Sequence, residues 1–337
     1  MMTFNRHIGS LALGLLLSMA MMQSAFAAFP SKYHPGHYMR LDLVSYDNAK
    51  LIYDRIKYEP QFVGVQVRIP WKVLEPRRGV YDFSAVVAQL NYLKSMPTPK
   101  RLIIELLDDW TDRYGVPNAP DYLRTAEFEY GVYKSSIGKV VARSWNYNVQ
   151  SREIALFKAL GARFNAEPYF EGMILDETAT GIRTWEWSRA NYTAEKAYAG
   201  QKRIMSGLKA AFPNTLCIQY INWYSGASGA DELTKLRGLF NHALQIGMGI
   251  GAPDVDVQVP HYTYPWYSAY AGSMPLVNSV EWDDWDKINP ATGRKVTAAE
   301  IFNFARYKLH LNYIPWSNRE PYFTNQVIPL VRRVGAP

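Results

Sequence analysis

The chain has 337 residues, of which 48% are hydrophobic, and 37 basic against 30 acidic residues give it a formal charge of +7 at pH 7. Cys217 is the only cysteine, so no disulfide can form within the chain and its stability must come from a hydrophobic core. Lysine and arginine are not concentrated in any run, which argues against nucleic acid as a partner. The basic balance instead favours an acidic partner, such as a uronate polymer or a membrane surface.

The first 27 residues have the three parts of a secretory signal peptide. Asn5-Arg6-His7 is a short positive region, Ile8 to Met22 is apolar, and Ala25-Phe26-Ala27 is a cleavage signal. The apolar run is short for a membrane span and no stop-transfer flank follows it, so we expect no stable membrane anchor. We therefore predict a secreted or periplasmic protein with a signal peptide at residues 1–27 and one domain at 28–337. Cleavage would leave 310 residues and, because Arg6 is the only charge removed, a charge of +6.

After the signal peptide, apolar runs typical of buried strands alternate with segments of helical periodicity. The eight expected strands are residues 38–44, 62–69, 101–107, 169–177, 215–221, 246–250, 275–280 and 309–314. Six intervening helices are expected near residues 47–58, 84–94, 154–164, 193–211, 236–244 and 298–308.

Repeated strand–helix units predict a parallel α/β sheet, and eight of them predict a closed (β/α)8 TIM barrel as a single domain. The alternative is an open, doubly wound sheet. That fold usually carries a glycine-rich phosphate loop after its first strand, whereas this loop begins Ser45-Tyr46-Asp47.

Polar and aromatic residues follow the predicted strands, at the end of a barrel where catalytic residues lie. The fourth and seventh strands end in Glu177 and Glu281, and carboxylates at the ends of buried strands are costly without a function. The candidate binding residues at the same strand ends are Arg68, Asp109, Trp110, Asp176, Trp223, His261, Tyr262, Trp282 and Trp316. No HExxH, CxxC, Walker or G-x-S-x-G motif occurs, so neither a metal nor a cofactor is predicted.

With these residues the chain resembles the clan A glycoside hydrolases, the barrel enzymes that include cellulase-like and β-galactosidase-like families. The segment Leu74-Glu75-Pro76 to Gly79-Val80-Tyr81-Asp82-Phe83 looks like the one after strand two in the β-galactosidase-like families. In the clan, the glutamate that ends strand four is the acid/base and the one that ends strand seven is the nucleophile. The resemblance implies these roles for Glu177 and Glu281. It further implies that Arg68 is the arginine of strand two, His261 and Tyr262 the pair after strand six, and Trp316 the platform after strand eight.

The chemistry of the two glutamates fits that resemblance. Retaining glycosidases need one carboxylic acid that protonates the leaving oxygen and one carboxylate that attacks the anomeric carbon, with the two carboxyl groups about 5–5.5 Å apart. Arg68 is expected to orient Glu281. Exposed tryptophans at the strand ends are expected to stack on sugar rings. The predicted function is a secreted or periplasmic retaining glycoside hydrolase that cleaves a polysaccharide or oligosaccharide.

Two other functions stay open at this point. Asp176 stands where the clan usually has asparagine, and the His261-Tyr262 pair is shifted from the usual pattern, which suits a carbohydrate-binding barrel without catalysis. A lyase for an acidic polysaccharide would need a base beside a neutralising arginine, for which His261 and Arg68 are the candidates. Product analysis distinguishes the three functions.

Overall fold

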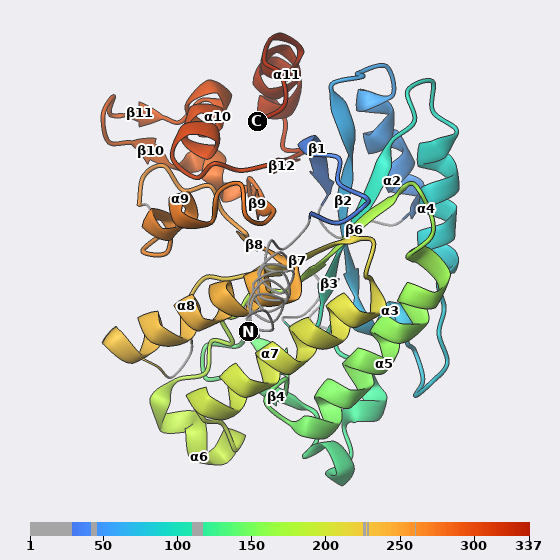
Figure 1. Cartoon of the computed structure of the whole chain (residues 1–337), viewed down its shortest axis with the longest axis vertical. Coiled ribbons are helices and arrows are strands. Elements are labelled where there is room, and N and C mark those ends of the chain that lie inside the picture. Colours follow the sequence, from blue (N-terminus) through green and yellow to red (C-terminus); the bar gives the residue numbers. More distant parts are fainter. Residues whose placement is uncertain (1–28, 42–45, 110–116, 225–226, 228, 260) are drawn as a thin grey trace, which may run out of the picture.

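The computed structural model describes residues 29–41, 46–109, 117–224, 227, 229–259 and 261–337. Eight parallel strands form a closed barrel, so the predicted (β/α)8 fold is confirmed. Helices lie around these strands (Figure 1). The strands are β1 (Gly36–Leu41), β2 (Phe62–Pro70), β3 (Arg101–Leu107), β6 (Phe170–Leu175), β7 (Leu216–Tyr220), β8 (Gly249–Ala252), β9 (Leu276–Asn278) and β12 (Tyr313–Ser317). β12 pairs with β1 and closes the barrel.

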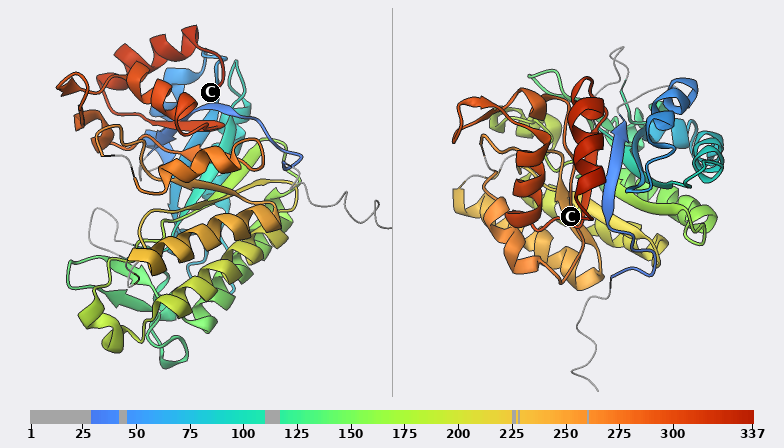
Figure 2. Two further views of the ribbon diagram at one scale, coloured as in Figure 1. Left: turned by 60° about the vertical axis from the view of Figure 1, so that its left-hand side comes forward. Right: turned by 90° about the horizontal axis from the view of Figure 1, so that it is seen from above.

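Helices follow most strands and cover the outside of the barrel. They are α2 (Tyr46–Tyr53), α3 (Trp71–Leu74), α4 (Ser84–Lys94), α5 (Tyr147–Phe164), α6 (Trp187–Ala190), α7 (Ala194–Ala211), α8 (Gly229–Ile246), α9 (Tyr267–Tyr270), α10 (Ala298–Tyr307) and α11 (Ile328–Arg333). Short 3₁₀ helices are η1 (Asp54–Ile56), η2 (Asp121–Leu123), η3 (Ala126–Phe128), η4 (Thr184–Glu186), η5 (Tyr264–Trp266) and η6 (Asp283–Asp286), and η7 (Phe323–Val327) is a π-helix. Figure 2 shows α5, α7 and α8 side by side along one side of the barrel.

The predicted signal peptide and its cleavage site at residues 1–27 lie outside the described residues. Within the described ranges, no helix is both long and apolar enough to cross a bilayer.

Two strands, β8 and β12, begin three or more residues later than predicted, in each case because the preceding helix ends in a turn. Gly247 has φ +73° and the N–H of Met248 returns to the carbonyl of Ala243, so α8 is capped before β8 begins at Gly249. His310 has φ +51° in the turn between α10 and β12, and β12 begins at Tyr313. The register of the last strand therefore differs from the prediction.

The interior of the barrel is filled by side chains in layers. The apolar cluster inside the barrel consists of Tyr38, Ile103, Ile174, Leu216, Ile218, Tyr220, Val277 and Tyr313, all fully buried. Toward the carboxyl ends of the strands, Tyr220, Gln66 and Ser279 form a hydrogen-bonded polar layer. The glycines of β8 make room for this packing, because a Cβ on Gly251 would lie 1.8 Å from the carbonyl oxygen of Val277.

A two-stranded insertion follows β3 and was not predicted. Its strands are β4 (Val132–Lys134) and β5 (Val140–Ala142), and an isolated bridge joins Asp109 to Val141. A second short antiparallel pair, β10 (Ile288–Asn289) and β11 (Arg294–Lys295), lies between β9 and α10. The first insertion matters for the site because it carries Lys139 to the mouth of the barrel.

Candidate active site

Glu281 follows β9 and lies beside a buried arginine of the first strand. Arg40 Nη2 is 2.5 Å from Glu281 Oε1, and the Arg40 side chain is only 1% exposed. The alternation of a strand explains this meeting, since Arg40 shares the inward face with Tyr38, and Glu281 continues the face of Val277. The cation can hold Glu281 ionised and oriented.

The expected role of Arg68 in orienting Glu281 stays a prediction, and the structure places Arg68 beside Glu105. Arg68 Nε lies 3.2 Å from Glu105 Oε1, and Glu105 Oε2 also lies 3.9 Å from Arg40 Nε. Gln66 donates to the same carboxylate at 2.7 Å. Glu105 thus lies between two arginines, and the guanidinium of Arg40 also contacts Glu281.

A buried aspartate fixes the backbone at Glu281. The N–H of Glu281 donates to Asp284 Oδ2 at 2.8 Å, and the N–H of Val255 donates to the same oxygen at 3.2 Å. Burial, together with the nearby charge of Asp254, raises the pKa of Asp284 to about 8. Asp284 therefore joins the loop after β8 to the loop after β9.

Glu177 follows β6 and is held by a lysine from the insertion. Lys139 Nζ lies 2.8 Å from Glu177 Oε1 and 2.7 Å from Asp109 Oδ2, and it also donates to the carbonyl of Ala179. The other oxygen of Glu177 accepts a hydrogen bond from the side-chain amide of Asn222, which follows β7. The ammonium and the amide together fix the positions of both Glu177 carboxylate oxygens.

Behind Glu177 lies a cluster of carboxylates around a small cavity of about 30 Å³. Its members are Asp108, Asp109, Glu153 and Asp176. Burial and mutual repulsion raise the pKa of Asp108 to about 7 and those of Asp109 and Glu153 well above their usual range. Burial likewise raises the pKa of Asp176 to about 6, against the lowering effect of Arg68.

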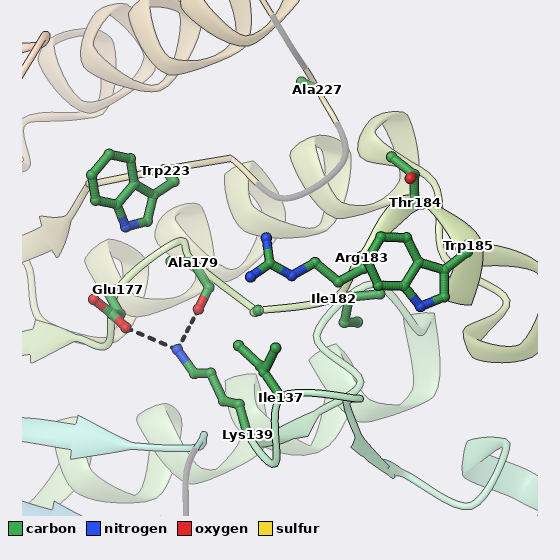
Figure 3. A pocket seen from close by; sticks show the side chains of 11 residues that line it. Ile137, Lys139, Glu177, Ala179, Ile182, Arg183, Thr184, Trp185, Trp223 and Ala227 are labelled. Atoms are coloured by element: carbon green, nitrogen blue, oxygen red, sulfur yellow. Dashed lines mark hydrogen bonds and ion pairs between the residues drawn. The ribbon is translucent and has the colours of Figure 1, made fainter.

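A cleft of about 540 Å³ opens beside Glu177 and Lys139 (Figure 3). The other residues that line it are Ile137, Ala179, Gly181, Ile182, Arg183, Thr184, Trp185, Trp223 and Ala227. Trp223 is 55% exposed and Trp185 is 74% exposed, so both indoles offer a free surface. Trp185, Arg183 and Lys139 are lining residues that sequence reasoning did not single out.

The predicted pair after strand six packs beside Trp223. The ring of His261 lies 4.9 Å from that of Trp223 in an edge-on arrangement, and Tyr262 donates to Glu232 at 2.6 Å. Burial lowers the pKa of His261 to about 4, so the imidazole is neutral at pH 7. His261 Nδ1 lies 2.8 Å from the hydroxyl of Thr263. The pair supports the Trp223 side of the cleft.

The remaining tryptophans differ in their positions. Trp282 is 51% exposed next to Glu281, with the Arg319 guanidinium over its ring. Trp316 is fully buried, where it packs on Trp285 and donates to His37 Nδ1, so the predicted platform offers no face to a sugar. It faces outward because Tyr313, three residues earlier in the same strand, faces inward. Trp110 lies outside the described residues.

Asp109 and Asp176 were both predicted to bind substrate, and both belong to the carboxylate cluster behind Glu177. Asp109 is 5% exposed and pairs with Lys139, while Asp176 accepts the N–H of Glu177 at 2.9 Å. Among the described residues, no group of three or more His, Cys, Asp and Glu side chains is arranged to hold a metal ion.

Sequence reasoning missed Arg40, Glu105, Lys139 and Asn222. Arg40 and Glu105 had a signal, because each is a charge inside an otherwise apolar strand and shares a face with residues two positions away. Lys139 had none, since its place depends on the fold of the insertion.

The chain matches no protein-family model, and it matches no curated protein in sequence. It is similar in structure to a GH5_18 protein from Streptomyces cattleya in complex with Manβ1-4GlcNAc, with a TM-score of 0.57 and 14% identity over 90% of this chain and 83% of that one. It is also similar to the catalytic domain of β-amylase from Paenibacillus polymyxa, with a TM-score of 0.60 and 8% identity over 90% of this chain and 100% of that one. A β-galactosidase from Marinomonas ef1 gives a TM-score of 0.53 and 9% identity over 83% of this chain and 53% of that one.

At these identities the likeness establishes the barrel fold. The membership of a glycoside hydrolase clan stays a prediction.

Proposed function

We propose that this protein is a retaining glycoside hydrolase that acts on an oligosaccharide or polysaccharide, with Glu281 as nucleophile and Glu177 as acid/base. The proposal depends on the placement of two glutamates after the fourth and seventh strands of one barrel. Each glutamate forms an ion pair with a buried basic residue, Arg40 or Lys139. The structural neighbours, whose names include a β-galactosidase and whose complexes hold a disaccharide, support the same reading.

The surroundings of Glu281 suit a nucleophile. Attack on the anomeric carbon requires an ionised carboxylate, and Arg40 supplies a cation that is fixed by Glu105. The hydrogen bond from the Glu281 N–H to Asp284 fixes the backbone, and Arg40 holds the carboxylate. The nucleophile is therefore already in position when substrate binds.

The surroundings of Glu177 suit both halves of its role if Lys139 can change partner. In the first step Glu177 must give a proton to the leaving oxygen, and in the second it must take one from water. Lys139 touches Asp109 as closely as Glu177, so it can remain with Asp109 while Glu177 is protonated. The adjoining carboxylates, with pKa values raised toward neutrality, can supply that proton.

The proposal includes the compartment. We infer that residues 1–27 are removed on export and that residues 28–337 act outside the cytoplasm. Amino-terminal sequencing of the protein recovered from an expressing bacterial host tests this, because export with cleavage gives a chain that begins at Ala28. A chain that retains residues 1–27 contradicts it.

A screen of neutral and acidic oligosaccharides with product analysis tests the activity. Proton NMR during the reaction shows whether the first anomer formed has the configuration of the substrate, which a retaining enzyme requires. Inversion of configuration contradicts the mechanism. An unsaturated product that absorbs in the ultraviolet identifies a lyase. Binding without any product identifies a carbohydrate-binding barrel.

A further inference from the structure

The cleft extends from Glu177 past Ala179 to the segment of η4, where Arg183 projects into it. Figure 3 shows the guanidinium of Arg183 reaching into the space between Trp223 and Trp185. The side chain is exposed to solvent, and no carboxylate of the described residues pairs with it. A cation with five donors thus faces the cleft with its hydrogen-bonding groups available.

The acidic groups near Arg183 are engaged elsewhere. Glu186 is 7% exposed, and its carboxylate accepts from the N–H and hydroxyl of Ser136, from Tyr133 and from the backbone N–H of Arg183. Glu177 is bound to Lys139. The charge of Arg183 is therefore not neutralised by its protein neighbours, and this end of the cleft attracts an anion.

Two indoles flank this cation. Trp185 and Trp223 are both more than half exposed, and an exposed indole matches the apolar C–H face of a pyranose ring. A guanidinium between two such faces presents a planar fork that fits a carboxylate or sulfate on a ring stacked beside it.

We propose that the cleft binds an acidic oligosaccharide, in which an anionic group on one sugar pairs with Arg183 while sugar rings stack on Trp185 and Trp223. This inference rests on the proposed function and names the substrate class. The favoured anion is the carboxylate of a hexuronate, because it forms a bidentate pair with a guanidinium, and a sulfate ester shares that chemistry.

Binding to a protein that cannot turn over its ligand tests the proposal. The Glu281→Gln variant is titrated calorimetrically with oligogalacturonates, glucuronate-substituted xylo-oligosaccharides and sulfated carrageenan oligosaccharides. Each acidic ligand is compared with its carboxyl-reduced or desulfated counterpart, which keeps the linkages and removes the charge. The same titrations are repeated with Arg183→Gln, with Trp185→Ala, and with Arg189→Gln as a matched exposed arginine outside the cleft lining.

We expect at least one acidic ligand to bind about tenfold or more tightly than its neutral counterpart, as a charge-assisted pair predicts. Arg183→Gln should remove that preference and leave the neutral ligand within about twofold. Trp185→Ala should weaken both ligands by about tenfold, and Arg189→Gln should change neither. Loss of the preference on desulfation rather than carboxyl reduction identifies a sulfate ester as the anion.

Equal binding of acidic and neutral ligands, or a preference that survives Arg183→Gln, overturns the inference. If the wild type hydrolyses a neutral glycan under either of these outcomes, the proposed hydrolase function stands without it. If no ligand binds and none is cleaved, both proposals fail together.

Discussion

The ammonium of Lys139 lies 2.8 Å from the carboxylate of Glu177, although the two residues are 38 positions apart and belong to different elements. Lys139 is 2% exposed and also contacts Asp109, so one buried cation serves two carboxylates. Its pKa is raised: burial lowers it, and the attraction of Asp109 and Glu177 outweighs that effect. The position of the proposed acid/base carboxylate is thus tied to the insertion after β3.

Lys139→Met should destabilise the protein, and more at pH 8 than at pH 5. Without the ammonium, the buried Asp109 carboxylate has lost its ion pair, which costs most at high pH, where it is charged, and less at low pH, where it can take up a proton. Removing one partner of a buried pair costs roughly 3–5 kcal/mol when the other stays charged. Denaturant unfolding at both pH values measures the effect, with Lys134→Met on the exposed face of β4 as control. A loss of stability that does not depend on pH would argue against an ion pair between Lys139 and Asp109.

Glu281→Gln should abolish turnover while the fold stays intact, because an amide cannot form the glycosyl ester. Glu177→Ala should slow substrates with poor leaving groups most, since an activated aryl glycoside leaves without protonation. Azide should then restore turnover of the activated substrate by attacking the covalent intermediate. The measurements are steady-state rates on matched aryl and alkyl glycosides of the sugar found by the screen. Equal losses on both, with no effect of azide, would remove Glu177 from this role.

Arg40→Lys should lower kcat by roughly 10- to 100-fold, because lysine keeps the charge but cannot span Glu281 and Glu105 with a planar fork. The acid limb of the kcat/KM profile should move to higher pH, since a less well stabilised Glu281 carboxylate takes up a proton more readily. The control is Arg332→Lys, which alters an arginine–glutamate pair with Glu59 away from the cleft. An unchanged pH profile would show that Arg40 serves only the packing of the barrel.

The buried imidazole of His37 should make the free energy of unfolding depend on pH in the acid range. Its Nδ1 accepts from the Trp316 indole and its Nε2 contacts the carbonyl of Gly335, so the ring is held neutral. Burial lowers its pKa from 6.5 to about 4. The unfolded chain therefore binds the proton first, and stability is full above about pH 6.5 and falls as pH drops toward 4.

The lowering of the His37 pKa on folding corresponds to roughly 3 kcal/mol of stability lost between pH 6.5 and 4. His37→Gln, which can still accept from Trp316, should lose correspondingly less over the same range. Urea unfolding of both proteins at several pH values gives the difference. Parallel pH dependences would contradict a neutral, buried His37.

Gly251→Ala should destabilise the barrel by several kcal/mol. The added Cβ would meet the carbonyl oxygen of Val277 at 1.8 Å and the ring of Tyr220 at 2.8 Å, so β8 would have to move. Gly335→Ala is the control, because nothing lies within 4 Å of its added Cβ. Thermal unfolding of both variants checks this, and equal stabilities would mean that β8 can shift without loss.

The sequence by itself determined the barrel. Apolar runs such as Arg101–Leu107 recur between helical segments, and a buried parallel strand must be apolar on both faces, so local pattern was enough to count eight strands. It also placed Glu177 and Glu281 at strand ends, because a carboxylate that ends an apolar run is visible without knowledge of the fold.

Only the tertiary structure decided which groups meet. The register of β12 buries Trp316 between the barrel and the surrounding helices. The fold also pairs Arg40, a residue of the first strand, with Glu281, which follows the seventh. Lys139 reached Glu177 through an insertion whose path no local pattern encodes. Hydrophobic periodicity is a property of neighbouring residues, whereas charge pairing depends on separations of a few ångströms between residues far apart in the chain, and those are fixed only when the barrel closes.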